Sequence, residues 1–383
     1  MIISTMLRPL ATLLLFASTA AHAQLSIEIT GAGANRQPIA IAEFAGEHIV
    51  AKALTSVLRA DLDRSGLFRL VEGAGEPLSD TSAINYPDWK NRGADALVAG
   101  NVTSGVSNGG NRYETRFRLH DVQKQVVLGG QTYTSNASQL RAAAHRAADF
   151  IYEKLIGEPG IFSTRIAYVV KSTGRYELQI ADADGMNAQT ALASREPIIS
   201  PTWSPDGKKL AVVLSKDGGS QLFLVNADGS GVTRLASSAG IDTEPQFSGD
   251  GQFIYFTSDR GGKPQIYRIP AEGGEAQRIT FEGSYNVTPR LSPNAKNMAY
   301  ITLNNGRYQL ALMDLATRQT QILTDSAKDE SPSFAPNGRM IIYATEIGGR
   351  GVLAAVSSDG RVKQKLSVQA ADVREPAWGP FLK

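Results

Sequence analysis

The sequence predicts a two-domain protein in which a small α/β domain is followed by an all-β propeller. The chain has 383 residues, which is more than one ordinary domain. Its 37 glycines and 17 prolines, with only 7% aromatic residues, suit many short strands joined by tight turns. A short motif also recurs every 43 or 44 residues through the C-terminal two thirds. A period of about 40–45 residues is typical of propeller blades.

The composition excludes several classes of function. The net charge is only +2, so the chain lacks the concentrated positive charge of a protein that binds nucleic acid or anionic lipid. The absence of cysteine excludes disulfides, thiolate metal sites, iron–sulfur clusters and a cysteine nucleophile. We therefore expect a monomer without a cofactor or a metal, which neither binds nucleic acid nor inserts into a membrane.

Residues 1–23 have the pattern of a signal peptide. Arg8 precedes an apolar run over residues 10–17, and the small-x-small sequence before Gln24 predicts cleavage between Ala23 and Gln24. The apolar run is too short to cross about 30 Å of hydrocarbon. The residue after the cleavage site is not cysteine, which excludes a lipoprotein. The sequence therefore predicts an exported protein.

Residues 24–158 predict the α/β domain. Apolar stretches over 39–44 and 96–99 predict strands, and 112–121 and 126–134 predict a hairpin. Two helices are expected from apolar residues at helical spacing: Leu54, Val57, Leu58 and Leu62 in the first, and Leu140, Ala144, Ala147, Ile151 and Leu155 in the second, which spans 137–155. Gly157 to Gly160, with Pro159 between them, predict the end of the second helix and the link between the domains.

Residues 159–383 predict the propeller. Five copies of the motif begin at prolines: PTWSPDG at Pro201, PQFSGDG at Pro245, PRLSPNA at Pro289, PSFAPNG at Pro332 and PAWGPFL at Pro376. The last copy stops after one strand, and its missing strands are expected at the front of the array, in 166–170, 176–180 and near 191–192. The sequence therefore predicts five blades, one of them split between both ends of the domain. A split blade closes the ring and removes exposed sheet edges.

Three features of the sequence could indicate a catalytic or metal site, but each has a simpler interpretation. Residues 105–109 fit the G-x-S-x-G pattern of serine hydrolases, yet an alternating strand follows them instead of a helix, so we predict a polar loop. The histidines after the leader, His48, His120 and His145, are scattered and lack metal-ligand spacing. Asp-Gly pairs such as Asp206-Gly207 are hairpin turn signals before they are calcium ligands.

Several stretches resemble the TolB family, the periplasmic component of the Tol–Pal system. They are RIAYVV from Arg165, PTWSPDG from Pro201, TSDR from Thr257, PQIY from Pro264 and QRITFEGS from Gln277. The SPDG repeat alone is weak evidence for the family, because the propellers of dipeptidyl peptidases share it. The order of leader, α/β domain and repeats is more specific to the TolB family. Members of the family usually have six blades, so one repeat is missing here, and we expect the loss between Pro201 and Pro245.

The resemblance implies a binding scaffold and not an enzyme. It would link the inner-membrane Tol proteins to the outer-membrane lipoprotein Pal, and support outer-membrane integrity and invagination during cell division. Other outer-membrane proteins are further candidate partners. Two alternatives remain at this point: a peptidase-like enzyme with a propeller, and a propeller that binds sugar or lipid. The second would need aromatic residues in the channel, whereas Trp203 and Trp378 occupy repeat positions that predict blade core.

The mature N-terminus is the candidate contact for the inner-membrane partner TolA. Apolar and polar residues alternate from Leu25 to Thr30, which predicts a strand able to join the sheet of a partner. Gly31-Ala32-Gly33 then predicts a hinge. The alternative is an ordinary first strand of the α/β domain. The family's TolA-binding segment lies here, which implies the contact residues Gln24, Leu25, Ser26, Ile27, Glu28, Ile29 and Thr30.

The candidate contact for Pal is one mouth of the propeller channel. Loops just before each repeat proline should converge there, because each leads into an equivalent strand of its blade. These loops are polar and mostly acidic, which suits a docking ring. Thr243-Glu244-Pro245 resembles a Pal-contacting loop of the family. The candidate contacts are Asp242, Thr243, Glu244, Thr288 and Glu330.

Overall fold

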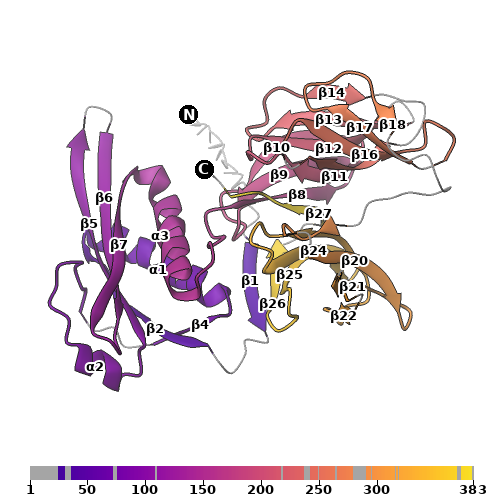
Figure 1. The fold of residues 1–383 in the computed structure, drawn as a ribbon. Coiled ribbons are helices and arrows are strands. Elements are labelled where there is room, and N and C mark those ends of the chain that lie inside the picture. Colours follow the sequence, from indigo (N-terminus) through magenta and orange to yellow (C-terminus); the bar gives the residue numbers. More distant parts are fainter. Residues whose placement is uncertain are drawn as a thin grey trace, which may run out of the picture.

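A computed structural model gives the fold, and Figure 1 shows the α/β domain beside the propeller. The structure describes residues 25–381 except 31–35, 72–75, 108–109, 217–218, 237–241, 249, 264, 279–289, 295, 315, 318 and 369–371. Residues 1–24, with the expected signal peptide and its cleavage pair Ala23 and Gln24, lie outside the described part. Within that part, no helix is long and apolar enough to cross a membrane.

The α/β domain is built on a mixed sheet in the order β4-β2-β5-β6-β7. Strand β2 runs parallel to β4 and β5, and the long strands β5, β6 and β7 form an antiparallel meander. Strand β3 pairs with β5 away from this path. The bounds are β2 Gln37–Ile41, β3 Ala45–Gly46, β4 Phe68–Leu70, β5 Ala96–Ser107, β6 Gly110–Asp121 and β7 Val126–Asn136. The four predicted strands are confirmed, although β5 is much longer than expected.

Two long helices, α1 (His48–Arg64) and α3 (Leu140–Ile156), pack together over the sheet. Their apolar faces bury the residues that the helical spacing identified, among them Leu54, Leu58 and Ile151. A one-turn 3-10 helix, η1 (Ala137–Gln139), precedes α3, and Gly157 ends α3 with a left-handed φ of 84°. The short helix α2 (Tyr86–Asn91) was not predicted; it buries Trp89 in a second, smaller apolar cluster.

The propeller has five antiparallel sheets, as predicted. The first is split: β27 (Asp372–Trp378), from the C-terminus, pairs with β8 (Arg165–Ser172), followed by β9 (Arg175–Asp182) and β10 (Gln189–Ser194). The second sheet is β11 (Ile198–Trp203), β12 (Lys209–Lys216), β13 (Gly219–Asn226) and β14 (Thr233–Ala236). The third is β15 (Asp242–Phe247), β16 (Phe253–Ser258), β17 (Gln265–Pro270) and β18 (Gln277–Arg278).

The fourth sheet is β19 (Arg290–Leu291), β20 (Asn297–Asn304), β21 (Arg307–Asp314) and β22 (Thr320–Ile322). The fifth is β23 (Asp329–Phe334), β24 (Met340–Ile347), β25 (Arg350–Ser357) and β26 (Lys363–Val368). This last sheet gains a fifth strand, β1 (Leu25–Thr30), on its outer edge. The N-terminal segment therefore belongs to the propeller sheet, and the alternative of an ordinary first strand of the α/β domain is wrong.

The repeat motif explains the turn after each inner strand. In the second blade the Ser204 hydroxyl donates to Asp206, and Asp206 also accepts the backbone N–H of Lys208. Gly207 takes a φ of 66°, a left-handed conformation that favours glycine. These bonds lower the pKa of Asp206, because they stabilise its ionised form. The carboxylate is engaged by its own turn, which supports the hairpin interpretation over a calcium site.

Apolar clusters join neighbouring blades. Separate clusters link the fifth blade to the split blade, the split blade to the second, the second to the third, and the fourth to the fifth. In the described part of the chain, no such cluster joins β15–β18 to β19–β22. The second and third blades, between which the missing repeat was expected, pack directly through residues such as Val213 and Phe256.

Candidate functional site

The inner strands of four blades share a backbone irregularity at the residue before the repeat proline. Ser200, Glu244, Ser331 and Glu375 have φ values of 51°, 52°, 51° and 51°. The pairing register with the next strand shifts across each of these positions, which marks a bulge. A residue before proline normally adopts an extended conformation, so the left-handed one is unfavourable and is imposed by the surrounding sheet.

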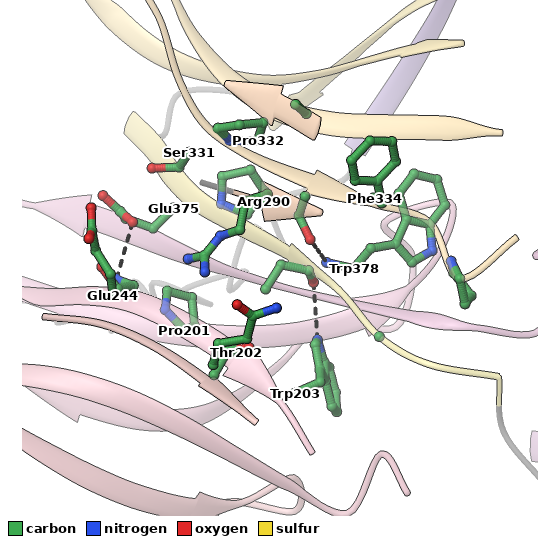
Figure 2. Close-up of a pocket in the computed structure, with 18 of the residues that line it drawn as sticks. Pro201, Thr202, Trp203, Glu244, Arg290, Ser331, Pro332, Phe334, Glu375 and Trp378 are labelled. Carbon is green, nitrogen blue, oxygen red and sulfur yellow. Dashed lines mark hydrogen bonds between the residues drawn. The ribbon is translucent and has the colours of Figure 1, made fainter. Parts of the chain in front are cut away.

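These four residues line a cavity of about 670 Å³ to which all five blades contribute (Figure 2). Figure 2 shows Glu244, Glu375 and Arg290 at one side of the cavity, and Phe334 and Trp378 at the other. The bulges therefore place one side chain from each of these four blades around a common channel. The expected convergence is confirmed for Glu244, Ser331 and Glu375, which lie in strands and not in loops; the expected loop at 286–288 lies outside the described residues.

The charged side of the cavity holds two carboxylates and one guanidinium. Burial raises the pKa of Glu375, although the backbone N–H of Ser200 (3.1 Å), the Ser331 hydroxyl and the charge of Arg290 oppose the shift. Burial also lowers the pKa of Arg290, against the opposing charges of Glu244 and Glu375. This half-buried group has more negative than positive charge, and it faces a space large enough for side chains of another protein.

The two tryptophans of the repeat line the same cavity, but their polar edges are engaged. Trp203 Nε1 donates to the Ala377 carbonyl at 3.0 Å, and Trp378 Nε1 donates to Thr164 Oγ1 at 2.9 Å. The guanidinium of Arg165 lies over the Trp203 ring, 5.1 Å from its centre. Trp203 belongs to the core cluster between two blades, as expected, but both tryptophans also line the channel, where aromatic residues were the condition for the sugar- or lipid-binding alternative.

The predicted Pal contacts differ in whether a partner protein could reach them. Asp242 is 0% exposed, and both of its carboxylate oxygens accept from Arg260 Nη2, at 2.9 and 2.8 Å. It supports the start of β15 and is not available to a partner. Glu244 accepts from the Thr257 hydroxyl at 3.2 Å and lines the cavity, and Thr243 is partly exposed beside it. Thr288 lies outside the described residues.

Glu330 is placed differently from Glu244. Its carboxylate accepts from Arg374 Nη1 at 3.0 Å, which joins the inner strands β23 and β27. The side chain remains 36% exposed, so a partner can reach it. Of the predicted set, Thr243, Glu244 and Glu330 are therefore the described residues that a docked protein could contact.

The candidate TolA-binding segment is docked on the propeller. β1 pairs antiparallel with β26, from Leu25 opposite Val368 to Thr30 opposite Lys363. Figure 1 shows the two strands side by side. Gln24, the first residue of the predicted contact, lies outside the described part. In this state one edge of residues 25–30 pairs with β26, and β1 is the outermost described strand of its sheet, so a partner's strand could pair with its other edge.

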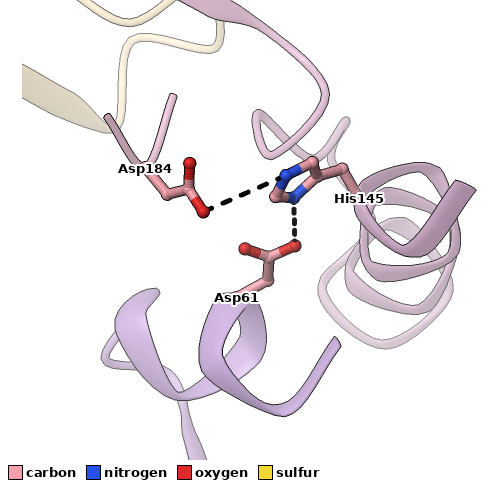
Figure 3. Close-up of side chains that lie close together, drawn as sticks. All are labelled: Asp61, His145 and Asp184. Carbon is pink, nitrogen blue, oxygen red and sulfur yellow. Dashed lines mark hydrogen bonds and ion pairs between the residues drawn. The ribbon is translucent and has the colours of Figure 1, made fainter. Parts of the chain in front are cut away.

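One cluster of polar residues was missed by the sequence analysis (Figure 3). His145 Nδ1 lies 2.6 Å from Asp61 Oδ2, and His145 Nε2 lies 4.0 Å from Asp184 Oδ2. Asp61 is 0% and His145 2% exposed. We name the interdomain charge cluster by its six members: Asp61, Arg64, Arg141, His145, Asp182 and Asp184. Its members come from α1 and α3 in the α/β domain, and from the end of β9 and the following turn in the propeller.

The interdomain charge cluster has carboxylate and imidazole atoms close enough to hold a metal ion. However, Arg64 already pairs with Asp61, and Arg141 already pairs with Asp184. The two guanidinium groups supply the positive charge that a metal would bring. We therefore interpret the group as an ion-pair network between the domains.

The serine-hydrolase pattern does not form a nucleophile elbow. Ser107 is the last residue of β5 and pairs with Gly110 at the start of β6, so strand leads to strand. Asn108 and Gly109 lie outside the described residues. His120 is bonded through Nδ1 to the Tyr86 hydroxyl at 3.0 Å, and His145 is bonded to Asp61. The hairpin thus lacks the strand–turn–helix context that the motif requires.

Comparisons with known proteins agree with this architecture. A family model described as the TolB amino-terminal domain matches residues 25–128, and one described as the TolB beta propeller domain matches 152–213 and 201–382. The chain is 56% identical to the Tol-Pal system protein TolB of Dechloromonas aromatica over 405 aligned residues, covering 94% of each chain. It is 58% identical to that of Aromatoleum aromaticum over 418, covering 98% of this chain and 97% of the relative.

Both alignments are longer than the 383 residues of this chain, so the relatives contain residues that it lacks. This agrees with the expected loss of one repeat from the propeller. Among solved structures, the crystal structure of TolB from Acinetobacter baumannii matches with a TM-score of 0.70 and 35% identity, covering 94% of this chain and 100% of that one. The domain order, the five-bladed ring and these similarities together show that the chain belongs to the TolB family of Tol-Pal system proteins.

Proposed function

We propose that this protein is a periplasmic, non-enzymatic scaffold of the Tol–Pal system. It links TolA, through residues 24–30, to the lipoprotein Pal, through the channel mouth, and so supports outer-membrane integrity and invagination during division. The leader pattern over 1–23 supports the periplasm. The proposal depends above all on one observation: half-buried, unbalanced charge at Glu244, Arg290 and Glu375 faces a cavity formed by all five blades.

Thr243 is the sharpest test of Pal docking. A Thr243→Arg substitution adds a long charged side chain at the partly exposed start of β15, beside Glu244. We expect at least a tenfold loss of Pal affinity, measured by titrating purified Pal onto the full chain. The arginine overfills the contact and offsets the excess negative charge of Glu244 and Glu375, and losing complementarity at the centre of an interface commonly costs about 2 kcal/mol or more, so the loss is of this order.

Thr317→Arg is the matched control. Thr317 is exposed in the turn between β21 and β22, which lies at the opposite end of the blades from the start of each inner strand. Equal Pal affinity for wild type and Thr243→Arg would move the site away from this mouth. We also expect weaker Pal binding than in six-bladed relatives, because a five-bladed ring is narrower and lacks one inner loop.

Deletion of residues 25–30 tests the contact with TolA. The deletion should abolish binding to purified TolA, because it removes the only strand offered to the partner's sheet in this proposal. It should leave Pal binding intact, because β1 lies on the outer edge of the fifth blade, away from the channel. TolA binding by the deletion variant would overturn this assignment, while preserved Pal binding shows that the propeller is folded.

A further inference from the structure

Strand β7 forms a long outer edge of the sheet in the α/β domain. It pairs with β6 on one side, and no strand in the described part of the chain pairs with its other side. The outermost strands of the blades, β1, β10, β14, β18 and β22, have six residues or fewer. A bulge at Leu128 interrupts only one end of β7, so residues 129–136 keep an unbroken register with β6. These eight residues, which we name the β7 edge, extend over about 26 Å.

The β7 edge lacks the usual protection against pairing with another chain. Exposed edges are commonly shielded by charged side chains, by proline or by a covering segment. β7 contains neither a charged residue nor a proline, and Gln131, Thr132 and Thr134 are exposed. Figure 1 shows β5, β6 and β7 on the side of the α/β domain that is farther from the propeller, so the propeller does not cover them. The main chain of the β7 edge is therefore available for pairing.

The neighbouring strand β6 carries a row of arginines. Phe117 packs in the core against Phe150 of α3, so the alternate residues of β6 lie on the open face of the sheet. The arginines of this row are Arg112, Arg116 and Arg118. Glu114 belongs to the same row and lies 3.3 Å from Arg116. The opposed residues of β7 include Gly130 and Thr132, which are small, and two strand spacings place the row within about 10 Å of an added strand.

Helix α3 adds two cations on the other face of the sheet. The guanidinium of Arg146 lies 5.1 Å from the centre of the Tyr133 ring, and the Tyr133 hydroxyl donates to the Arg146 carbonyl at 3.3 Å. Lys154 Nζ lies 5.6 Å from the centre of the Phe150 ring, which packs beside Gly129. The five basic groups of β6 and α3 face two acidic ones, Glu114 and Glu153, although the whole chain has a net charge of only +2.

We propose that the β7 edge binds an acidic segment of another protein, which joins the sheet as an extended strand. Main-chain pairing with residues 129–136 supplies affinity, and acidic side chains on the two faces of the added strand meet the basic groups of β6 and α3. A second copy of this chain is a poorer occupant, because two β7 edges in contact would bring both basic sets together. The site is separate from the channel and from β1, and it does not depend on the contacts proposed for Pal and TolA.

A synthetic peptide of ten residues tests the site on the full chain. The probe alternates glutamate with valine and threonine and has blocked ends. One control peptide has lysine in place of every glutamate, and another has N-methyl groups on its inner amides. We expect the glutamate probe to bind at least tenfold more tightly than either control in fluorescence anisotropy, and more weakly as the salt concentration rises. Amide exchange of residues 129–136 should slow at least fivefold in the complex, while that of residues 25–30 in β1 stays unchanged.

Charge reversal at Arg146 gives a matched comparison. Arg146→Glu should weaken binding of the glutamate probe at least fivefold, because an anion replaces the cation beside the added strand. Arg361→Glu makes the same change of net charge in the propeller, at a side chain that is 79% exposed, and should leave the affinity unchanged. Near-ultraviolet circular dichroism checks that both variants are folded.

Several results would overturn the proposal. They are no binding at about 1 mM glutamate probe, slowed exchange in β1 instead of the β7 edge, and equal binding of the N-methylated peptide. An equal loss of affinity for Arg146→Glu and Arg361→Glu would show that only net charge matters. A dimer of the chain that protects residues 129–136 would assign the β7 edge to a second copy instead.

Discussion

Two polar sites of this protein differ in how their charges are balanced. In the interdomain charge cluster, three carboxylates meet two guanidinium groups and an imidazole, and Asp61 and His145 are almost fully buried. In the channel, Arg290 faces two carboxylates in a cavity, on a backbone that is strained at four positions. The first site is completed by the protein's own second domain, whereas the second has room for another protein.

The difference suggests separate roles for the two sites. A paired, buried network resists the loss of any member, because each remaining charge would stay buried without its partner. A half-open site with strained backbone costs stability in the free protein, and such sites are found where a ligand is bound. Substitutions in the interdomain charge cluster should therefore reduce stability, while substitutions in the channel should change it little or even increase it.

The largest effect is expected for Asp61→Ala. The substitution leaves Arg64 and His145 buried without the carboxylate that both contact. We expect a loss of about 3–5 kcal/mol in the free energy of unfolding, measured by denaturant titration of the full chain. Asp63→Ala, two residues away, removes a carboxylate that pairs with Arg36 and is 44% exposed, and should cost at most about 1 kcal/mol. Similar losses for both variants would contradict the contrast between the two sites.

Asp242→Ala should have the next largest effect. Asp242 was predicted as a partner contact, but its carboxylate is fully buried on Arg260. We expect a loss of about 1.5–3 kcal/mol in the free energy of unfolding, as for other charged hydrogen bonds. Thr243→Ala, at the neighbouring position, should change it by less than about 0.5 kcal/mol. If Asp242→Ala is as stable as the wild type, the carboxylate has no structural role, and Asp242 becomes a candidate partner contact again.

The repeat made most of the propeller predictable from the sequence. The fixed spacing of the prolines located five inner strands, and the lone strand near Trp378 predicted the split blade. Helical spacing likewise identified the buried faces of α1 and α3. These features are local or periodic, so a single sequence contains them. The capping signal of α2, Asn85 followed by Pro87, was equally local and was overlooked.

The candidate sites were less predictable, because they depend on contacts between distant residues. Alternation identified β1 as a strand, but its partner β26 lies more than 300 residues away, and the pattern cannot specify it. Asp61, His145 and Asp184 are similarly scattered in the sequence and meet only when the domains pack. The left-handed φ before four of the repeat prolines is opposed by local preferences and is imposed by the sheet, so local reasoning predicts an extended residue there.

The stability difference between the wild type and Glu375→Gln should depend on pH, which tests how strongly the channel buries this carboxylate. Because burial raises the pKa of Glu375 above its ordinary value of 4.5, the folded protein binds this proton more tightly than the unfolded chain. The wild type should therefore gain stability relative to the variant as the pH falls from 7 through the raised pKa, and the gain should level off near pH 4.5.

Denaturant titrations of both proteins at several pH values between 4.5 and 7 measure this difference, since the other titrating groups are common to both. At pH 7 the variant should be at least as stable as the wild type, because glutamine removes a half-buried charge and keeps an acceptor for the Ser200 N–H. Stability curves that remain parallel across this range would show that Glu375 is well solvated in the channel.

Ser200→Gly tests the strain itself, and the expected effect is the smallest. A left-handed φ costs an L-residue roughly 1–2 kcal/mol, and glycine avoids this cost. The greater freedom of glycine in the unfolded chain opposes the gain by about 0.4–1 kcal/mol. We therefore expect a net stabilisation of up to about 1 kcal/mol in denaturant titrations, with the backbone N–H still donating to Glu375. Ser331→Gly relieves the same φ but loses the hydroxyl that bonds Glu375, so it should gain less. If both variants are destabilised, favourable local contacts stabilise the bulges, and the left-handed residues do not strain the free protein.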